Sequence, residues 1–134
     1  MKIKFIDTIL KESKQQESSV KNSLVVMLLH MLKCKYQSNY QNKSSWRDSI
    51  LNSYEYFINE FDGIGKGSLY KNFYMRKMDL DQIYQLTRRR ASYETKLPLI
   101  EFPVKCEWSK ELLVNIDFIY DFINEFGYGI LENK

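Results

Sequence analysis

The chain's single histidine, His30, has the widest chemical repertoire of any residue here, because a neutral imidazole can act as a general base or as a metal ligand. Cys34 follows one helical turn later and would share its helix face. Both residues lie in a nearly all-apolar segment, however, and a structural zinc site needs four ligands at characteristic spacings. We therefore expect His30 to be a core imidazole hydrogen-bonded to a carbonyl, a carboxylate or a tyrosine hydroxyl. We predict no metal and no other cofactor.

An enzyme centred on His30 is one functional alternative, with Cys34, Glu94 or Tyr84 as companions in a pocket between helices. Nucleophilic catalysis needs a nucleophile beside a base that a third group orients. No such order can be assembled from this sequence, and carboxylate pairs such as Asp79 with Asp81 lack the companions of a hydrolytic site. These observations favour a protein that is not an enzyme.

A basic stretch, Arg88-Arg89-Arg90, offers a second kind of chemistry, the binding of phosphate. Three consecutive arginines on a helix spread over roughly 200°, so they cannot all contact one ligand. Glu94 lies four residues after Arg90 and can pair with it. We expect a solvated face with salt bridges. The alternative is a nucleic-acid-binding accessory factor whose phosphate contacts would be Lys71, Arg76, Lys77, Arg88 and Arg89.

The elements that position these residues are predicted to be helices. The 134 residues suit one domain, and a hydrophobic content of 44% is too high for a disordered chain. The spacing of Val20, Leu24, Met27, Met31 and Cys34 by three and four residues indicates a buried helical stripe. We predict an all-α fold: one compact bundle of four to five main helices around a central helix at about 19–37. The first 37 residues form either one helix or two that meet near Ser18-Ser19.

The remaining segments carry signals for helix starts and ends. Ser45 with Asp48 is a candidate capping box, Asp79 can cap a helix restart, and Ser109 can cap a short helix. Both prolines, Pro98 and Pro103, fall in one segment, which predicts an extended strap near 97–107. A last amphipathic helix should close at Gly127. The predicted core comprises Leu24, Leu28, Leu32, Trp46, Ile50, Phe57, Phe73, Ile83, Leu97, Phe102 and Trp108.

Four separated pieces of the sequence resemble a bacterial family called domain of unknown function twenty-nine, which is frequent in cyanobacteria. They are the His30–Lys33 helix, the start Ser45-Trp46-Arg47, the segment Glu94–Pro98, and Phe102-Pro103 followed by Cys106, Trp108 and Ser109. The family-like core would cover about 6–118 of a single domain spanning 1–134, with an extra C-terminal helix and tail at about 116–134. Cys34 stands where the family usually has Trp, and Lys96 where it has Gly. The resemblance implies a helical bundle and no established activity.

We single out a candidate cluster of functional or structural residues, namely His30, Cys34, Trp46, Arg47, Glu94 and Trp108. The favoured function is a non-enzymatic module that binds a protein partner or itself. Self-association through the C-terminal helix would bury Tyr120, Ile123 and Phe126. The net charge of +3 permits nucleic acid without demanding it, and no apolar run is long enough to predict a membrane span. We expect a cytoplasmic protein.

Overall fold

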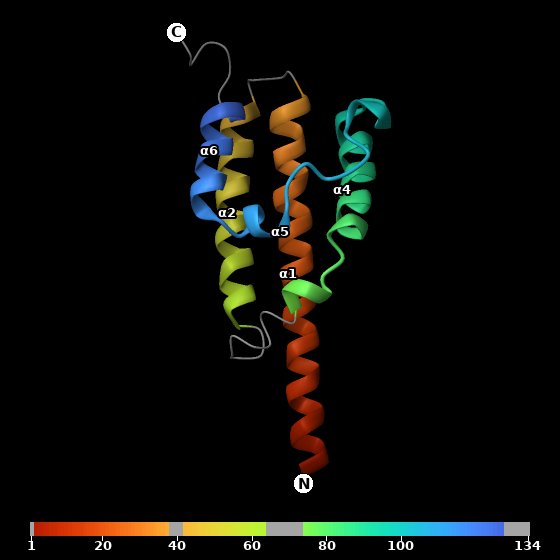
Figure 1. Ribbon diagram of the computed structural model, residues 1–134, viewed down its shortest axis with the longest axis vertical. Coiled ribbons are helices and arrows are strands. Elements are labelled where there is room, and N and C mark those ends of the chain that lie inside the picture. Colours follow the sequence, from red (N-terminus) through yellow and green to blue (C-terminus); the bar gives the residue numbers. More distant parts are fainter. Residues whose placement is uncertain (1, 38–41, 64–73, 128–134) are drawn as a thin grey trace.

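In the computed structural model the longest helix, α1 (Lys2–Tyr36), lies between the other helices in its C-terminal part and extends beyond them in its N-terminal part (Figure 1). The structure describes residues 2–37, 42–63 and 74–127; the side chains of residues 2–14, 16 and 63 are not described. A single helix forms where one or two were expected, because this stretch contains neither proline nor glycine. Ser18 and Ser19 do not break it, and the Ser23 hydroxyl donates to the Ser19 carbonyl without ending the helix.

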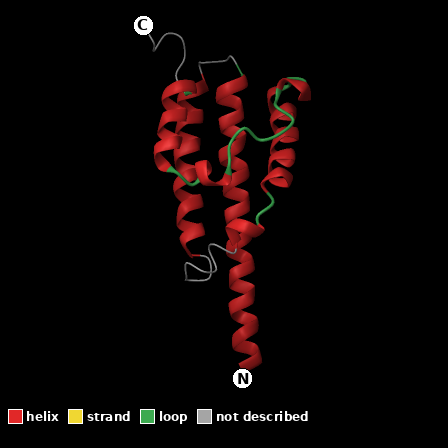
Figure 2. Cartoon of the chain, viewed as in Figure 1, coloured by secondary structure: helices red, strands yellow, loops and turns green. Residues whose placement is uncertain are grey.

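Two helices flank α1 on opposite sides, α2 (Lys43–Gly63) and α4 (Leu80–Thr95). The strap, residues 97–107, then leaves α4 and crosses α1, and it contains the short 3₁₀ helix η3 (Leu99–Glu101). It leads to α5 (Lys110–Leu113) and to α6 (Ile116–Phe126), which lies beside α2. The described residues hold helices and loops and no strand, so the predicted all-α class is confirmed (Figure 2).

The predicted stripe on α1 forms the centre of the core. Val20, Leu24, Met27, Met31 and Cys34 are all buried. Of the other residues predicted for the core, Leu28, Leu32, Trp46, Ile50, Phe57, Ile83, Phe102 and Trp108 are buried as well. Leu97 is only half-buried, which corrects its assignment to the core, and Phe73 lies outside the described residues.

The helix ends match the sequence signals at three places. The Asp79 carboxylate accepts from the backbone N–H of Gln82, and the Ser109 hydroxyl accepts from that of Leu112. Gly127 closes α6 by donating its own N–H to the Ile123 carbonyl. The predicted capping box of Ser45 with Asp48 is wrong, because α2 begins at Lys43 and Ser45 lies inside its first turn.

Candidate functional site

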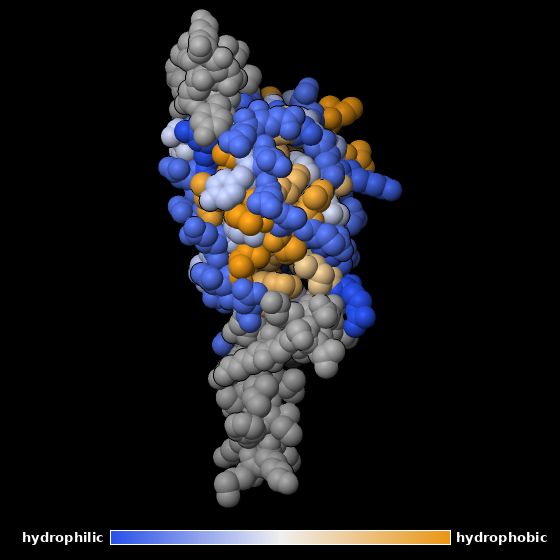
Figure 3. Space-filling model, turned by 60° about the vertical axis from the view of Figure 1, so that its left-hand side comes forward, coloured by the Kyte–Doolittle hydropathy of each residue, from blue (hydrophilic) through white to orange (hydrophobic). Residues whose placement is uncertain are grey.

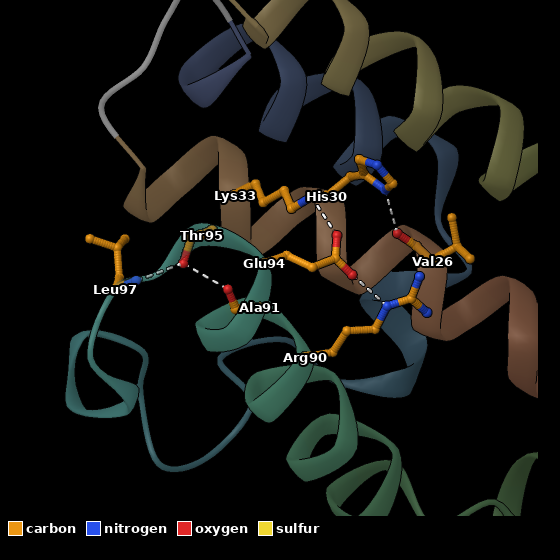
Figure 4. A network of polar contacts seen from close by, with 8 residues as sticks. All are labelled: Val26, His30, Lys33, Arg90, Ala91, Glu94, Thr95 and Leu97. Atoms are coloured by element: carbon orange, nitrogen blue, oxygen red, sulfur yellow. Dashed lines mark hydrogen bonds and ion pairs between the residues drawn. The ribbon is translucent and has the colours of Figure 1, made fainter.

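His30 lies on α1 one turn after Val26 and is partly buried. Its Nδ1 is 2.8 Å from the Val26 carbonyl oxygen (Figure 4). A carbonyl can only accept, so Nδ1 donates, and the neutral ring keeps its lone pair on Nε2. Burial lowers the pKa of His30 below its ordinary value, although the hydrogen bond to Val26 opposes this. The ring is therefore mainly neutral at pH 7. Its bond to a carbonyl meets the expectation, but His30 is only partly buried, which corrects its assignment to the core.

Glu94 joins α4 to α1 close to this histidine. Its carboxylate accepts from Lys33 Nζ at 2.9 Å and from Arg90 Nε at 2.7 Å, so the expected pairing with Arg90 is present (Figure 4). Burial alone would raise the pKa of Glu94, but the hydrogen bonds from Arg90 and Lys33 outweigh it and hold the pKa below its usual value. The ionised carboxylate therefore links α4 to α1 through its ion pair with Lys33.

The other members of the candidate cluster lie among different neighbours. Cys34 is buried, and burial raises its pKa to about 11, so the thiol is protonated at pH 7. Trp108 packs edge-on against Phe122 of α6, with 5.4 Å between ring centroids. Arg47 Nη1 donates to the Gly127 carbonyl at 2.8 Å. The cluster thus divides into three parts. His30 and Glu94 lie at the α1–α4 contact, and Arg47 and Trp108 contact α6 or the residue that ends it. Cys34 and Trp46 are buried in the core.

The strap is held to α4 by side chains that donate to its backbone carbonyls. Tyr84 donates to Pro103, Gln85 to Val104, and Arg88 to both Phe102 and Leu99. Sequence reasoning missed this set because backbone carbonyls carry no residue signature. Arg88 therefore binds two carbonyls of the strap, and its assignment as a phosphate contact stays a prediction.

The remaining basic residues of the phosphate alternative also differ from one another. Lys77, Arg76 and Arg89 are all exposed, and Lys77 also pairs with Glu17 at 3.3 Å. Lys71 lies outside the described residues.

A second polar cluster, also missed by sequence reasoning, joins the end of α1 to the strap. Glu107 accepts from the Tyr36 hydroxyl at 2.5 Å and from Lys35 Nζ at 2.6 Å. Burial raises the pKa of Tyr36, and the hydrogen bond to Glu107 adds to this effect. Lys35 Nζ also lies 5.2 Å from the centre of the Phe126 ring, which brings α6 into the same cluster.

The family model for "Domain of unknown function DUF29" matches residues 4–119 of the chain. The chain belongs to this family. Neither the search of curated proteins nor that of solved structures found a match. None of the helices described in this DUF29 member is long and apolar enough to cross a membrane.

Two surface grooves lie along α1 of the DUF29 domain. The first, of about 430 Å³, is lined by Glu17, Ser18, Lys21, Tyr74, Lys77, Met78, Asp79, Gln82 and Ile83. The second, of about 440 Å³, is lined by Ser19, Asn22, Ser23, Val26, Ser49, Asn52, Ser53 and Tyr56. His30 lines neither groove, and no group of three His, Cys, Asp or Glu residues placed to hold a metal occurs in the described part of the chain.

Large apolar side chains are exposed on two outer helices of the DUF29 domain. On α6, Ile116 and Tyr120 face outward, and Tyr120 is 52% exposed. On α4, Leu86 and Tyr93 face outward, and Tyr93 is 85% exposed. Figure 3 brings the α2 and α6 side forward and shows apolar side chains gathered among hydrophilic ones. Ile123 and Phe126, which were expected to serve self-association, instead pack against the core.

Proposed function

We propose that this DUF29 member is a non-enzymatic, self-associating interaction module that uses the outer face of α6. The observation that carries the proposal is the exposure of Ile116 and Tyr120 on a helix whose opposite face is buried. The two residues are one turn apart and so share a face. Exposed apolar side chains that cluster on a folded surface are typical of protein interaction sites.

The polar residues considered for catalysis form hydrogen bonds within and between elements of the fold. This structural use supports the proposal of a module that is not an enzyme. His30 bonds to its own helix, Glu94 joins α4 to α1, and Tyr84 fastens the strap. The thiol of Cys34 is buried and protonated, which is the opposite of an activated nucleophile.

The nucleic-acid alternative has weaker support. Two of the basic residues it requires, Lys77 and Arg88, already bind acceptors within the chain. Phosphate binding depends on cations that are free to replace condensed counterions.

Light scattering over a range of protein concentrations tests the proposal. We expect the mass of the wild-type chain to rise with concentration, and the double variant Ile116→Ser, Tyr120→Ser to stay monomeric. Tyr56→Ser is the matched control, because Tyr56 is similarly exposed but lies on α2. A wild-type chain that is monomeric at every concentration contradicts the proposal.

A further inference from the structure

The exposed face of α6 carries negative charge around its apolar residues. Asp117 and Asp121 lie on this face and are exposed, and neither forms a salt bridge with a described residue. The helix contains no lysine or arginine. Two cations that contact α6, Lys43 and Arg47, donate to the carbonyls at its C-terminus.

The exposed face of α4 carries the opposite charge. Leu86, Arg89 and Tyr93 follow one another at spacings of three and four residues, so they share one side of the helix. All three are exposed, and Arg89 forms no hydrogen bond or ion pair with the part of the chain that the structure describes. Lys96, exposed at the helix end, adds a second positive charge.

These two faces lie at opposite edges of the molecule, with α1 and α2 between the helices that carry them (Figure 1). They cannot meet within one molecule, but they can meet between two copies. Both faces combine exposed apolar side chains with charge of one sign, so contact between them would bury apolar surface and pair opposite charges.

We infer that α6 of one copy docks on α4 of the next, in a head-to-tail assembly. This inference rests on the proposed function, self-association through α6, and names its partner surface. A two-fold contact of α6 with α6 would set Asp117 and Asp121 against the same acids of the partner. Like charges brought together are unfavourable, so the head-to-tail contact is preferred. Such a contact forms a ring if its rotation closes and a filament if it does not.

The experiment uses two charge-reversed forms of the full chain and sedimentation velocity. The first form carries Asp117→Lys and Asp121→Lys, and the second carries Arg89→Glu and Lys96→Glu. Each form alone presents two faces of the same sign, so we expect its self-association to weaken at least about tenfold. An equal mixture should assemble again, because each reversed face then meets its complement on the other form.

Controls separate this contact from general charge effects and from unfolding. Lys21→Glu with Lys105→Glu makes the same charge change as Arg89→Glu with Lys96→Glu at exposed positions elsewhere, and it should assemble like wild type. Thermal melts of all forms verify that each is folded. Since exposed charges are screened by salt, association of the wild type should weaken as ionic strength rises.

The outcomes distinguish the inference from the proposed function. Restored assembly in the mixture supports the head-to-tail contact. A closed dimer that is lost with Asp117→Lys and Asp121→Lys but kept with Arg89→Glu and Lys96→Glu overturns the head-to-tail contact. It leaves the proposed self-association through α6 intact. Assembly that survives both reversals also overturns it. A wild-type chain that never associates contradicts both proposals.

Discussion

The Tyr84 hydroxyl donates a 2.6 Å hydrogen bond to the backbone carbonyl of Pro103, and this bond fastens the strap to α4. The Tyr84 side chain is fully buried. The Pro103 carbonyl lies in the strap, outside the helices, so its hydrogen bond comes from a side chain of another element. The strap determines where α5 and α6 lie, because it is the covalent connection that carries the chain from α4 to α5.

Tyr84→Phe should destabilise the fold, because it leaves the Pro103 carbonyl without its donor while preserving the ring. We expect a loss of about 1–2 kcal/mol in the free energy of unfolding. Denaturant titration measures it. Tyr93→Phe is the matched control and should change nothing, since Tyr93 is almost fully exposed. Equal stability of the two variants would show that the bond is unimportant.

Trp46→Ala should cost roughly 3–5 kcal/mol, the range for removing a large buried aromatic side chain. Trp46 is 8% exposed and belongs to the core. A thermal melt checks the prediction, with Tyr56→Ala as the control on the exposed side of the same helix. If Trp46 were a binding residue only, its variant would melt with the wild type.

The parts of the fold that could be predicted from sequence are those governed by local chemistry. Asp79 and Ser109 cap helices as expected, because a short oxygen-bearing side chain satisfies free N–H groups within three residues. The core stripe on α1 follows from helical periodicity alone. The prediction that Ser45 caps α2 was wrong, because the helix starts two residues before Ser45, at Lys43. Capping residues in a sequence do not determine a helix boundary uniquely.

The contacts that sequence reasoning missed are distant in the chain or involve the backbone. Arg47 binds the Gly127 carbonyl 80 residues away, and Arg88 binds carbonyls of the strap. Neither acceptor has a side-chain signature, so only the packing of α6 and the strap reveals them. Glu94 shows the difference between local and distant contacts. Its pairing with Arg90 was expected from their spacing in one helix, but its bond to Lys33 of another helix was not.

His30 should titrate below the ordinary histidine pKa of about 6.5, because burial disfavours the charged ring. The unfolded chain then binds the proton more readily than the folded one. The contribution of His30 to the free energy of unfolding is therefore greatest at neutral pH. It decreases as the pH drops from about 6.5 toward the pKa of the folded state. An NMR titration of the ring measures the pKa directly, since the chain has one histidine.

His30→Gln is the companion variant for the pH dependence. It should remove the stability change between neutral pH and the folded pKa, while the change caused by carboxylates at lower pH persists. A ring that titrates at or above the ordinary value would contradict the partial burial of His30.

Gly127→Ala should destabilise the end of α6, because an added methyl has no room. Its Cβ would lie 2.6 Å from the Ile123 carbonyl oxygen and 2.7 Å from Arg47 Cγ. Relief requires moving α6 or breaking the bond from Arg47 to the Gly127 carbonyl, at a cost of about 1–3 kcal/mol. Denaturant titration and hydrogen exchange in α6 test this. Asn124→Ala, at an exposed position of the same helix, should have little effect.

Lys96→Gly should stabilise the chain, because Lys96 is a non-glycine residue in the left-handed conformation, with φ of 61°. It ends α4 in the geometry that glycine adopts without steric cost. Relief of that strain exceeds the entropy glycine adds to the unfolded chain, so we expect a gain of up to about 1 kcal/mol. Lys96→Ala removes the same charge and keeps the strain, so it should bring no gain. Thermal melts of both variants compare them, and equal melting temperatures would show that relief of strain does not exceed the entropy that glycine adds to the unfolded chain.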